Sequence, residues 1–229
     1  MIYLPYISDD DLESAVQSVV NCIFQVQAER SDIYRNVIYP FSAIFDGVVN
    51  RIILDDLLLK ETVRQEQKTV QNAIGEFHQK ILGSIPGWQN LGTGQLIDVC
   101  NPITKIIAYI KNKHNTVKGS DRTSIYENLL YAMPTPTYQD FTAYYVEIIP
   151  KKARKNLIYN RPFTRIYNNT KKRRYPNLKR LIINRKKFYY RSLSMLFEIL
   201  PDAISKVAGV NQLSQAEKER FRTLFDRAY

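Results

Sequence analysis

Asp98 and Lys111 are the residues of this chain whose types and spacing could carry chemistry together. Each lies in a short apolar run, residues 96–99 and 105–111, and a turn signal at residues 101–102 predicts a hairpin that joins two strands. The residue two before Lys111 shares its face of the sheet, because side chains alternate along a strand. A carboxylate here could hold Mg²⁺, which activates water, and a lysine could offset the charge of a phosphate.

Tyr109 occupies the position, two residues before Lys111, where a second acid would complete such a centre. A phenol is neutral at pH 7 and is a poor ligand for Mg²⁺. An Asp and a Lys at this spacing also occur by chance, as a surface pair on a half-buried hairpin. The surrounding sequence must therefore decide between a catalytic centre and an ordinary hairpin.

Helix and strand patterns alternate around this hairpin. A β-branched and aromatic run predicts a further strand over residues 141–149, and the basic stretch after it is expected to be loop with one strand near residues 181–183. Helical spacing of apolar residues, with capping and turn signals, predicts helices over residues 8–28, 41–49, 54–82, 119–130, 192–207 and 214–228. The pattern predicts a single α/β domain over residues 1–229, with a helical annex.

The positive charge of the chain lies in one segment. Residues 151–191 contain sixteen Lys and Arg residues and no acid, so the rest of the chain carries 17 basic and 22 acidic residues. Tyrosines are interleaved with these cations. A field this concentrated favours binding to a polyanion such as nucleic acid, through phosphate contacts, over a merely solvated basic surface.

Composition limits the remaining classes. Hydrophobic residues make up 45% of the 229 residues, as in an ordinary globular protein, and no apolar run approaches the ~18 residues of a membrane span. The N-terminus lacks the charged and apolar regions of a signal peptide, so we expect the cytoplasm. Cys22 and Cys100 are too few for a disulfide framework or a cysteine-ligated zinc site.

Several phrases of the chain together resemble one enzyme family. They are residues 74–80, 87–92, 97–99, 106–116 and 144–151. The chain is similar in these phrases to the restriction endonucleases that cut GG-N-CC and GG-(A/T)-CC sites, which carry the PD-(D/E)xK motif. The resemblance spans roughly residues 1–165 and is most specific around residues 74–130. It implies a restriction-endonuclease-like nuclease core, in which helices flank a mixed sheet, with a helical annex.

The resemblance also implies roles for individual residues. Asp98 matches the metal-binding Asp and Lys111 the catalytic lysine, with Mg²⁺ as the cofactor, while Tyr109 stands where the family has Glu. Glu76, on the helix before the hairpin, would be a further catalytic and metal-binding acid, or else a solvated helical residue. If not Glu76, another nearby acid replaces the missing ligand, or the enzyme is weakened. The expected DNA contacts are Lys113, His114, Asn115, Lys151, Lys152, Lys171, Lys172, Arg173 and Arg174.

The expected function is therefore that of a type II restriction endonuclease, a Mg²⁺-dependent enzyme that hydrolyses both strands of double-stranded DNA. A near-palindromic site implies a two-fold homodimer with one active centre for each strand. Two other readings stay open. Tyr109 favours a non-catalytic DNA-binding protein on the same fold, and the basic, Tyr-rich segment is also typical of an RNA-binding protein.

Overall fold

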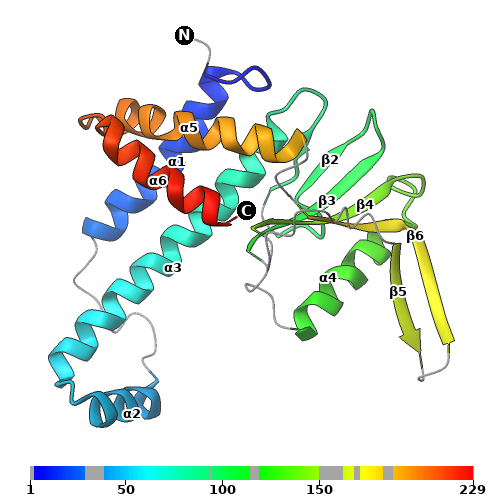
Figure 1. Cartoon of the computed structure of the whole chain (residues 1–229). Helices are drawn as coiled ribbons and strands as arrows, with labels where there is room; N and C mark the ends of the chain where they lie inside the picture. Colours follow the sequence, from blue (N-terminus) through cyan, green and yellow to red (C-terminus); the bar gives the residue numbers. More distant parts are fainter. Residues whose placement is uncertain are drawn as a thin grey trace.

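The computed structural model describes residues 3–28, 39–92, 94–113, 119–149, 162–167, 171–182 and 188–228. A six-stranded sheet with the order β1-β2-β3-β4-β6-β5 lies on one side of the described structure, beside a group of helices (Figure 1). The strands are β1 (Gln89–Asn90), β2 (Val99–Asn101), β3 (Ile106–Lys113), β4 (Thr142–Ile149), β5 (Pro162–Tyr167) and β6 (Lys171–Ile182). The helices are α1 (Asp9–Ala28), α2 (Pro40–Asn50), α3 (Leu54–Gly83), α4 (Gly119–Ala132), α5 (Phe188–Ala208) and α6 (Gln215–Ala228).

Strand β3 lies between β2 and β4 and has a different relation to each. It pairs antiparallel with β2 through a tight turn, in which the Asn101 side-chain Oδ1 accepts a hydrogen bond from the Thr104 backbone N–H at 2.9 Å. It pairs parallel with β4, because α4 carries the chain back between the two strands. The sheet is therefore mixed and flanked by helices, and the predicted α/β class is confirmed.

Each face of the sheet has its own apolar core, because successive side chains of a strand point to opposite faces. The face that α4 covers contains Ile107, Ala143 and Tyr145 of the sheet, together with Ile125 and Leu129 of α4. The opposite face contains Ala108, Ile110, Val146 and Ile148, together with Phe225 of α6. Trp88 packs against this second core, and Cys100 is buried in the first.

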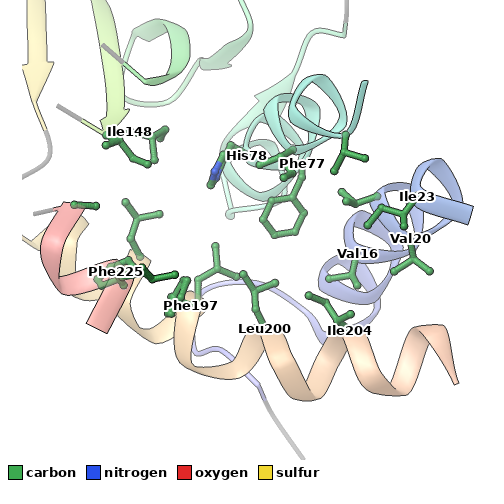
Figure 2. Close-up of a pocket in the computed structure, with 18 residues that line it drawn as sticks. Val16, Val20, Ile23, Phe77, His78, Ile148, Phe197, Leu200, Ile204 and Phe225 are labelled. Atoms are coloured by element: carbon green, nitrogen blue, oxygen red, sulfur yellow. The ribbon is translucent and has the colours of Figure 1, made fainter. Parts of the chain in front are cut away.

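The predicted helical annex is formed by α1, the second half of α3, α5 and α6 (Figure 1). These helices and the end of β4 line a partly open apolar pocket of about 480 Å³, with residues such as Val16, Phe77, Phe197 and Leu200 (Figure 2). His78 also lines the pocket, and burial lowers its pKa to about 4. The described helices contain no segment long and apolar enough to cross a membrane.

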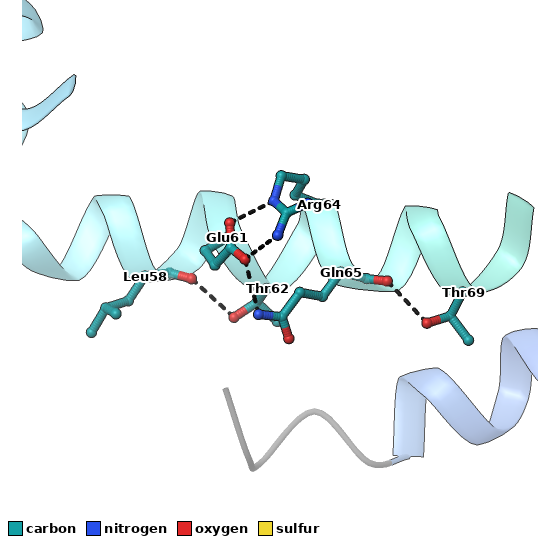
Figure 3. A network of polar contacts seen from close by, with 6 residues as sticks. All are labelled: Leu58, Glu61, Thr62, Arg64, Gln65 and Thr69. Atoms are coloured by element: carbon teal, nitrogen blue, oxygen red, sulfur yellow. Dashed lines mark hydrogen bonds and ion pairs between the residues drawn. The ribbon is translucent and has the colours of Figure 1, made fainter. Parts of the chain in front are cut away.

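Helix α3 connects the annex to the sheet and continues well beyond both. Its buried residues, Phe77 and Ile81, lie near its C-terminal end. The exposed first half is stabilised by contacts along the helix, where the guanidinium of Arg64 binds the Glu61 carboxylate and lowers its pKa to about 2 (Figure 3). At the other end Gly83 is required, since a Cβ there would lie 2.5 Å from the Cβ of Asn90 in β1.

Helix α2 packs at the free end of α3, far from the sheet (Figure 1). The structure describes all eleven of its residues, and none of them is buried. Side chains that are at least 63% exposed in and beside it are Tyr39, Phe41, Ile44, Phe45, Val48, Val49, Ile53 and Leu54. Monomeric soluble proteins rarely expose so many neighbouring apolar side chains, so this apolar patch has the character of an interaction surface.

Two sequence-based predictions about strands were wrong. Residues 96–98, predicted as strand, lie outside β2, which begins at Val99. The stretch predicted as loop with one strand near residues 181–183 contains two strands, β5 and β6. Strand β6 pairs with β4 over residues 178–182, whereas residues 171–175 pair with β5. We call the antiparallel pair formed by residues 162–167 of β5 and 171–175 of β6 the basic ribbon. Pairing with the buried strand β4 outweighs the weak strand preference of Lys and Asn.

Candidate active site

Asp98 is held at the point where pairing between β2 and β3 ends. Its backbone N–H donates to the Ala108 carbonyl oxygen at 3.1 Å, as a strand residue would. Its side-chain Oδ2 accepts a hydrogen bond from the backbone N–H of Ile110, at 2.6 Å. The carboxylate oxygen thereby accepts the hydrogen bond that a backbone carbonyl would accept if the pairing of the two strands continued. It lies level with Ile110, directly beside the strand that carries Lys111.

Asp98 is largely shielded from solvent. The residue is 8% exposed, and this burial raises the pKa of its carboxyl group. The hydrogen bond from Ile110 and the positive charge of Lys111 act in the opposite direction, toward a lower pKa. The effect of the Lys111 charge indicates that the two predicted catalytic side chains lie close together. The Asp98 carboxylate is thus held on the strand that carries Lys111, and the catalytic roles of the two residues stay a prediction.

Tyr109 contacts Lys111 directly. The Lys111 Nζ lies 4.9 Å from the centroid of the Tyr109 ring, within the range of a cation–π interaction. The ring also packs against the apolar core beneath α4. Tyr109 therefore supports the lysine from the position where the resembling family has an acid.

Glu147 is a residue of this region that the sequence analysis missed. In the parallel pairing of β3 and β4 it stands opposite Lys111, and it is 0% exposed. Residues paired in this way share a face, so Glu147 lies on the same face as Lys111 and Tyr109. A signal was available, because Glu147 is the single charged residue within the β-branched and aromatic run of residues 141–149.

The donor set fits a magnesium ion that is shared with a substrate. Across the described residues, no group of three His, Cys, Asp or Glu side chains gathers that could hold a metal ion. Mg²⁺ in phosphoryl-transfer sites is usually held by one or two carboxylates, with waters and phosphate oxygens completing the octahedron. Asp98 offers one carboxylate, with Oδ2 already engaged by Ile110. With such an ion bound, these groups would suit metal-assisted attack on a phosphate, next to a lysine.

Glu76 is exposed on α3. This helix contacts β3 through Asn112, whose side-chain Nδ2 donates to the Gln71 carbonyl oxygen at 3.5 Å and lies beside Gly75. Asn112 alternates with Lys111 and points to the opposite face of the sheet. The contacts among described residues thus bring α3 to the other face of β3, and none of them brings Glu76 to Asp98.

The predicted DNA contacts fall in three places. Lys113 is exposed at the end of β3. Lys171, Lys172, Arg173 and Arg174 lie on β6, where their backbone pairs with β5 in the basic ribbon. His114, Asn115, Lys151 and Lys152 lie outside the residues that the structure describes.

Known proteins share much of this sequence. A sequence model of the Eco47II restriction endonuclease family matches residues 4–209. The chain is 35% identical to the type II restriction enzyme Eco47II of Escherichia coli, over the full length of both proteins. It is 34% identical to the type II restriction enzyme Sau96I of Staphylococcus aureus over 159 residues, which cover 68% of this chain and 59% of that enzyme. No solved structure matches the chain.

Proposed function

The chain belongs to the Eco47II restriction endonuclease family, and we propose that it cuts double-stranded DNA at a short, near-palindromic site of the GG-N-CC kind. It is a type II restriction enzyme by this membership, and the proposal concerns its substrate site, cofactor and residues. The observation that carries the proposal is the Asp98 carboxylate, fixed by the Ile110 N–H beside Lys111.

The proposed chemistry divides between the two side chains and a cofactor. Bound Mg²⁺ would supply a Lewis acid that makes water a better nucleophile at neutral pH. Asp98 would hold the ion through the oxygen that Ile110 leaves available. The Lys111 ammonium would offset charge on the scissile phosphate and orient the attacking water, and the Tyr109 ring would limit where that ammonium can move. Glu76 remains a proposed further acid, and the cytoplasm remains the proposed compartment.

Plasmid digestion with Mg²⁺ or with EDTA tests this function. Discrete fragments that form with Mg²⁺ and disappear with EDTA support a site-specific, metal-dependent endonuclease. A metal-independent gel shift with no cleavage would instead indicate a DNA-binding protein on the same fold, the reading that Tyr109 favours. Preferential binding of RNA over duplex DNA would contradict both.

Salt should weaken DNA binding steeply, and the basic ribbon should account for much of that effect. Residues 151–191 hold sixteen cations and no acid, and each phosphate contact adds about −0.9 to the log–log salt slope. Replacing Lys171, Lys172, Arg173 and Arg174 together with Ala should make the slope shallower by about 3.6 if all four touch phosphates. Fluorescence anisotropy across a salt series measures it. An unchanged slope would show that these residues face away from DNA.

We further propose that the enzyme acts as a homodimer through the apolar patch of α2. Cutting both strands of a symmetric site needs two centres related by a two-fold axis. The eight exposed apolar side chains in and beside α2 supply an apolar surface that a second copy of the chain would cover. His114, Asn115, Lys113, Lys151 and Lys152 remain proposed contacts to the DNA held between the two copies.

Introducing charge into the apolar patch should separate the two copies. Phe45 and Val48 are 70% and 72% exposed, so Phe45→Glu with Val48→Glu should leave the fold intact and weaken dimerisation at least about tenfold. Val210→Glu, at a 56% exposed position after α5, is the matched control and should remain dimeric. Light scattering with and without a cognate duplex measures the mass. One wild-type chain per duplex at micromolar protein would reject the homodimer.

A further inference from the structure

Glu147 is an unusual residue for its place in the fold. Strand β4 lies inside the sheet, between β3 and β6, and its neighbours Val146 and Ile148 are buried. Burying a carboxylate costs several kcal/mol unless charges or hydrogen bonds compensate for the lost water. Glu147 is nevertheless 0% exposed. A strand that needed this position only for packing would be served better by a β-branched residue.

The sheet places Glu147 beside the active centre. It is paired in register with Lys111, and neighbouring strands lie about 4.8 Å apart. Asp98 approaches β3 from the other side, level with Ile110. Lys111 therefore has a carboxylate-bearing residue on each side: Asp98, just before β2, and Glu147, on β4. Both acids are buried, and both lie within one residue of the level of Lys111.

Tyr109 leaves position 109, two residues before Lys111, without a carboxylate. The second acid of the resembling family would stand at position 109, on the same face as Lys111. Here that position is filled by a ring that packs into the core and contacts the Lys111 ammonium. A carboxylate on the adjacent strand, at the level of Lys111, still lies on this face and can serve the same ion.

We propose that Glu147 supplies the carboxylate that position 109 lacks, so that Asp98 and Glu147 together bind the divalent cation. This inference rests on the proposed function of the Asp98 and Lys111 centre. A purely structural Glu147, a buried counter-charge for Lys111, is the competing explanation. It predicts a loss of stability without a specific loss of metal binding.

The test measures metal binding in the absence of DNA. Tyrosine-sensitised Tb³⁺ luminescence reports a site for hard, oxygen-seeking cations, and displacement by Mg²⁺ identifies the relevant site. Glu147→Gln keeps the size of the side chain and removes its charge. It should weaken metal binding by about tenfold or more, with Asp98→Asn giving a similar loss. Glu219→Gln, on the exposed surface of α6, is the control and should bind as the wild type does.

A second variant separates a missing ligand from a damaged fold. Tyr109→Glu in the Glu147→Gln background restores an acid at the family position, and it should recover metal binding. If Glu147 is only a counter-charge for Lys111, Glu147→Gln loses stability but keeps its metal affinity, so there is no loss of metal binding for Tyr109→Glu to restore. If Glu147→Gln does not fold, this double variant and Glu147→Asp, which retains a carboxylate, still decide the question. The proposal expects at least one of them to fold and bind metal.

The outcomes separate the role of Glu147 from the proposed nuclease function. Wild-type metal binding in Glu147→Gln, or a loss in Glu76→Gln instead, would overturn the role of Glu147 and leave the nuclease function standing. A wild-type protein without any site from which Mg²⁺ displaces Tb³⁺ would overturn it as well. Failure of the proposed function appears separately, as the absence of Mg²⁺-dependent plasmid cleavage by the wild type.

Discussion

Asp98→Asn should reduce DNA cleavage by about three orders of magnitude or more while leaving DNA binding intact. The amide can still accept the hydrogen bond from Ile110, so the end of the hairpin should keep its structure. The amide has no charge with which to hold a divalent cation. Metal-ion catalysis stabilises the transition state by several kcal/mol, and about 1.4 kcal/mol corresponds to a tenfold change in rate. Binding should survive or tighten, because a carboxylate near the scissile phosphate repels it.

Single-turnover cleavage across a magnesium titration, with anisotropy for binding, measures both quantities. Asp140→Asn is a suitable control, because this exposed acid pairs with Lys105 at the opposite end of β3. It should cut at the wild-type rate. Undiminished cleavage by Asp98→Asn would place the catalytic centre elsewhere in the chain.

Lys111→Met should reduce the cleavage rate by about 10²- to 10³-fold, the usual cost of removing one preorganised electrostatic contact to the transition state. Met preserves the length and apolar character of the side chain, so it can still pack over the Tyr109 ring. Metal binding should be retained, because the carboxylates remain and a nearby positive charge is lost. This combination of slow cleavage with retained metal affinity distinguishes Lys111 from Asp98.

Two measurements check the interpretation of Lys111→Met. Lys60→Met, on an exposed position of α3, should have no effect on cleavage or on metal binding. Tb³⁺ displacement by Mg²⁺ should give the same affinity in Lys111→Met as in the wild type, or a higher one. A Lys111→Met enzyme that cuts as fast as the wild type would show that the ammonium is not part of the centre.

Much of the geometry of the proposed centre could be predicted because it is local in the sequence. Asp98 and Lys111 belong to one hairpin with a short turn, and side-chain alternation fixes which residues share a face. The resemblance around residues 74–130 was confirmed by the family match and by the two type II restriction enzymes. The helices were also predictable, because their apolar spacing and capping residues are local properties of the chain.

Glu147 could not be placed in this way, because its relation to Lys111 depends on a parallel pairing across α4. Nothing local to residues 142–149 sets which of them stands opposite Lys111. The strand β6 was missed for a similar reason, since tertiary pairing with β4 decides the structure of a charged segment whose own strand preference is weak. The position of Glu76 relative to the sheet depends on how α3 packs, which periodicity does not reveal.

Strand β6 connects the basic ribbon to the strands that carry Glu147 and Lys111. Its C-terminal end at Ile182 pairs with Glu147, which pairs with Lys111. From residue 171 to residue 182 a strand spans about 36 Å, at about 3.3 Å per residue. A five-base-pair site covers only ~17 Å of duplex, at ~3.4 Å per base pair. The cations of the basic ribbon can therefore touch backbone outside the bases that are read, and the footprint on DNA should extend past the recognition site by a distance set by strand length.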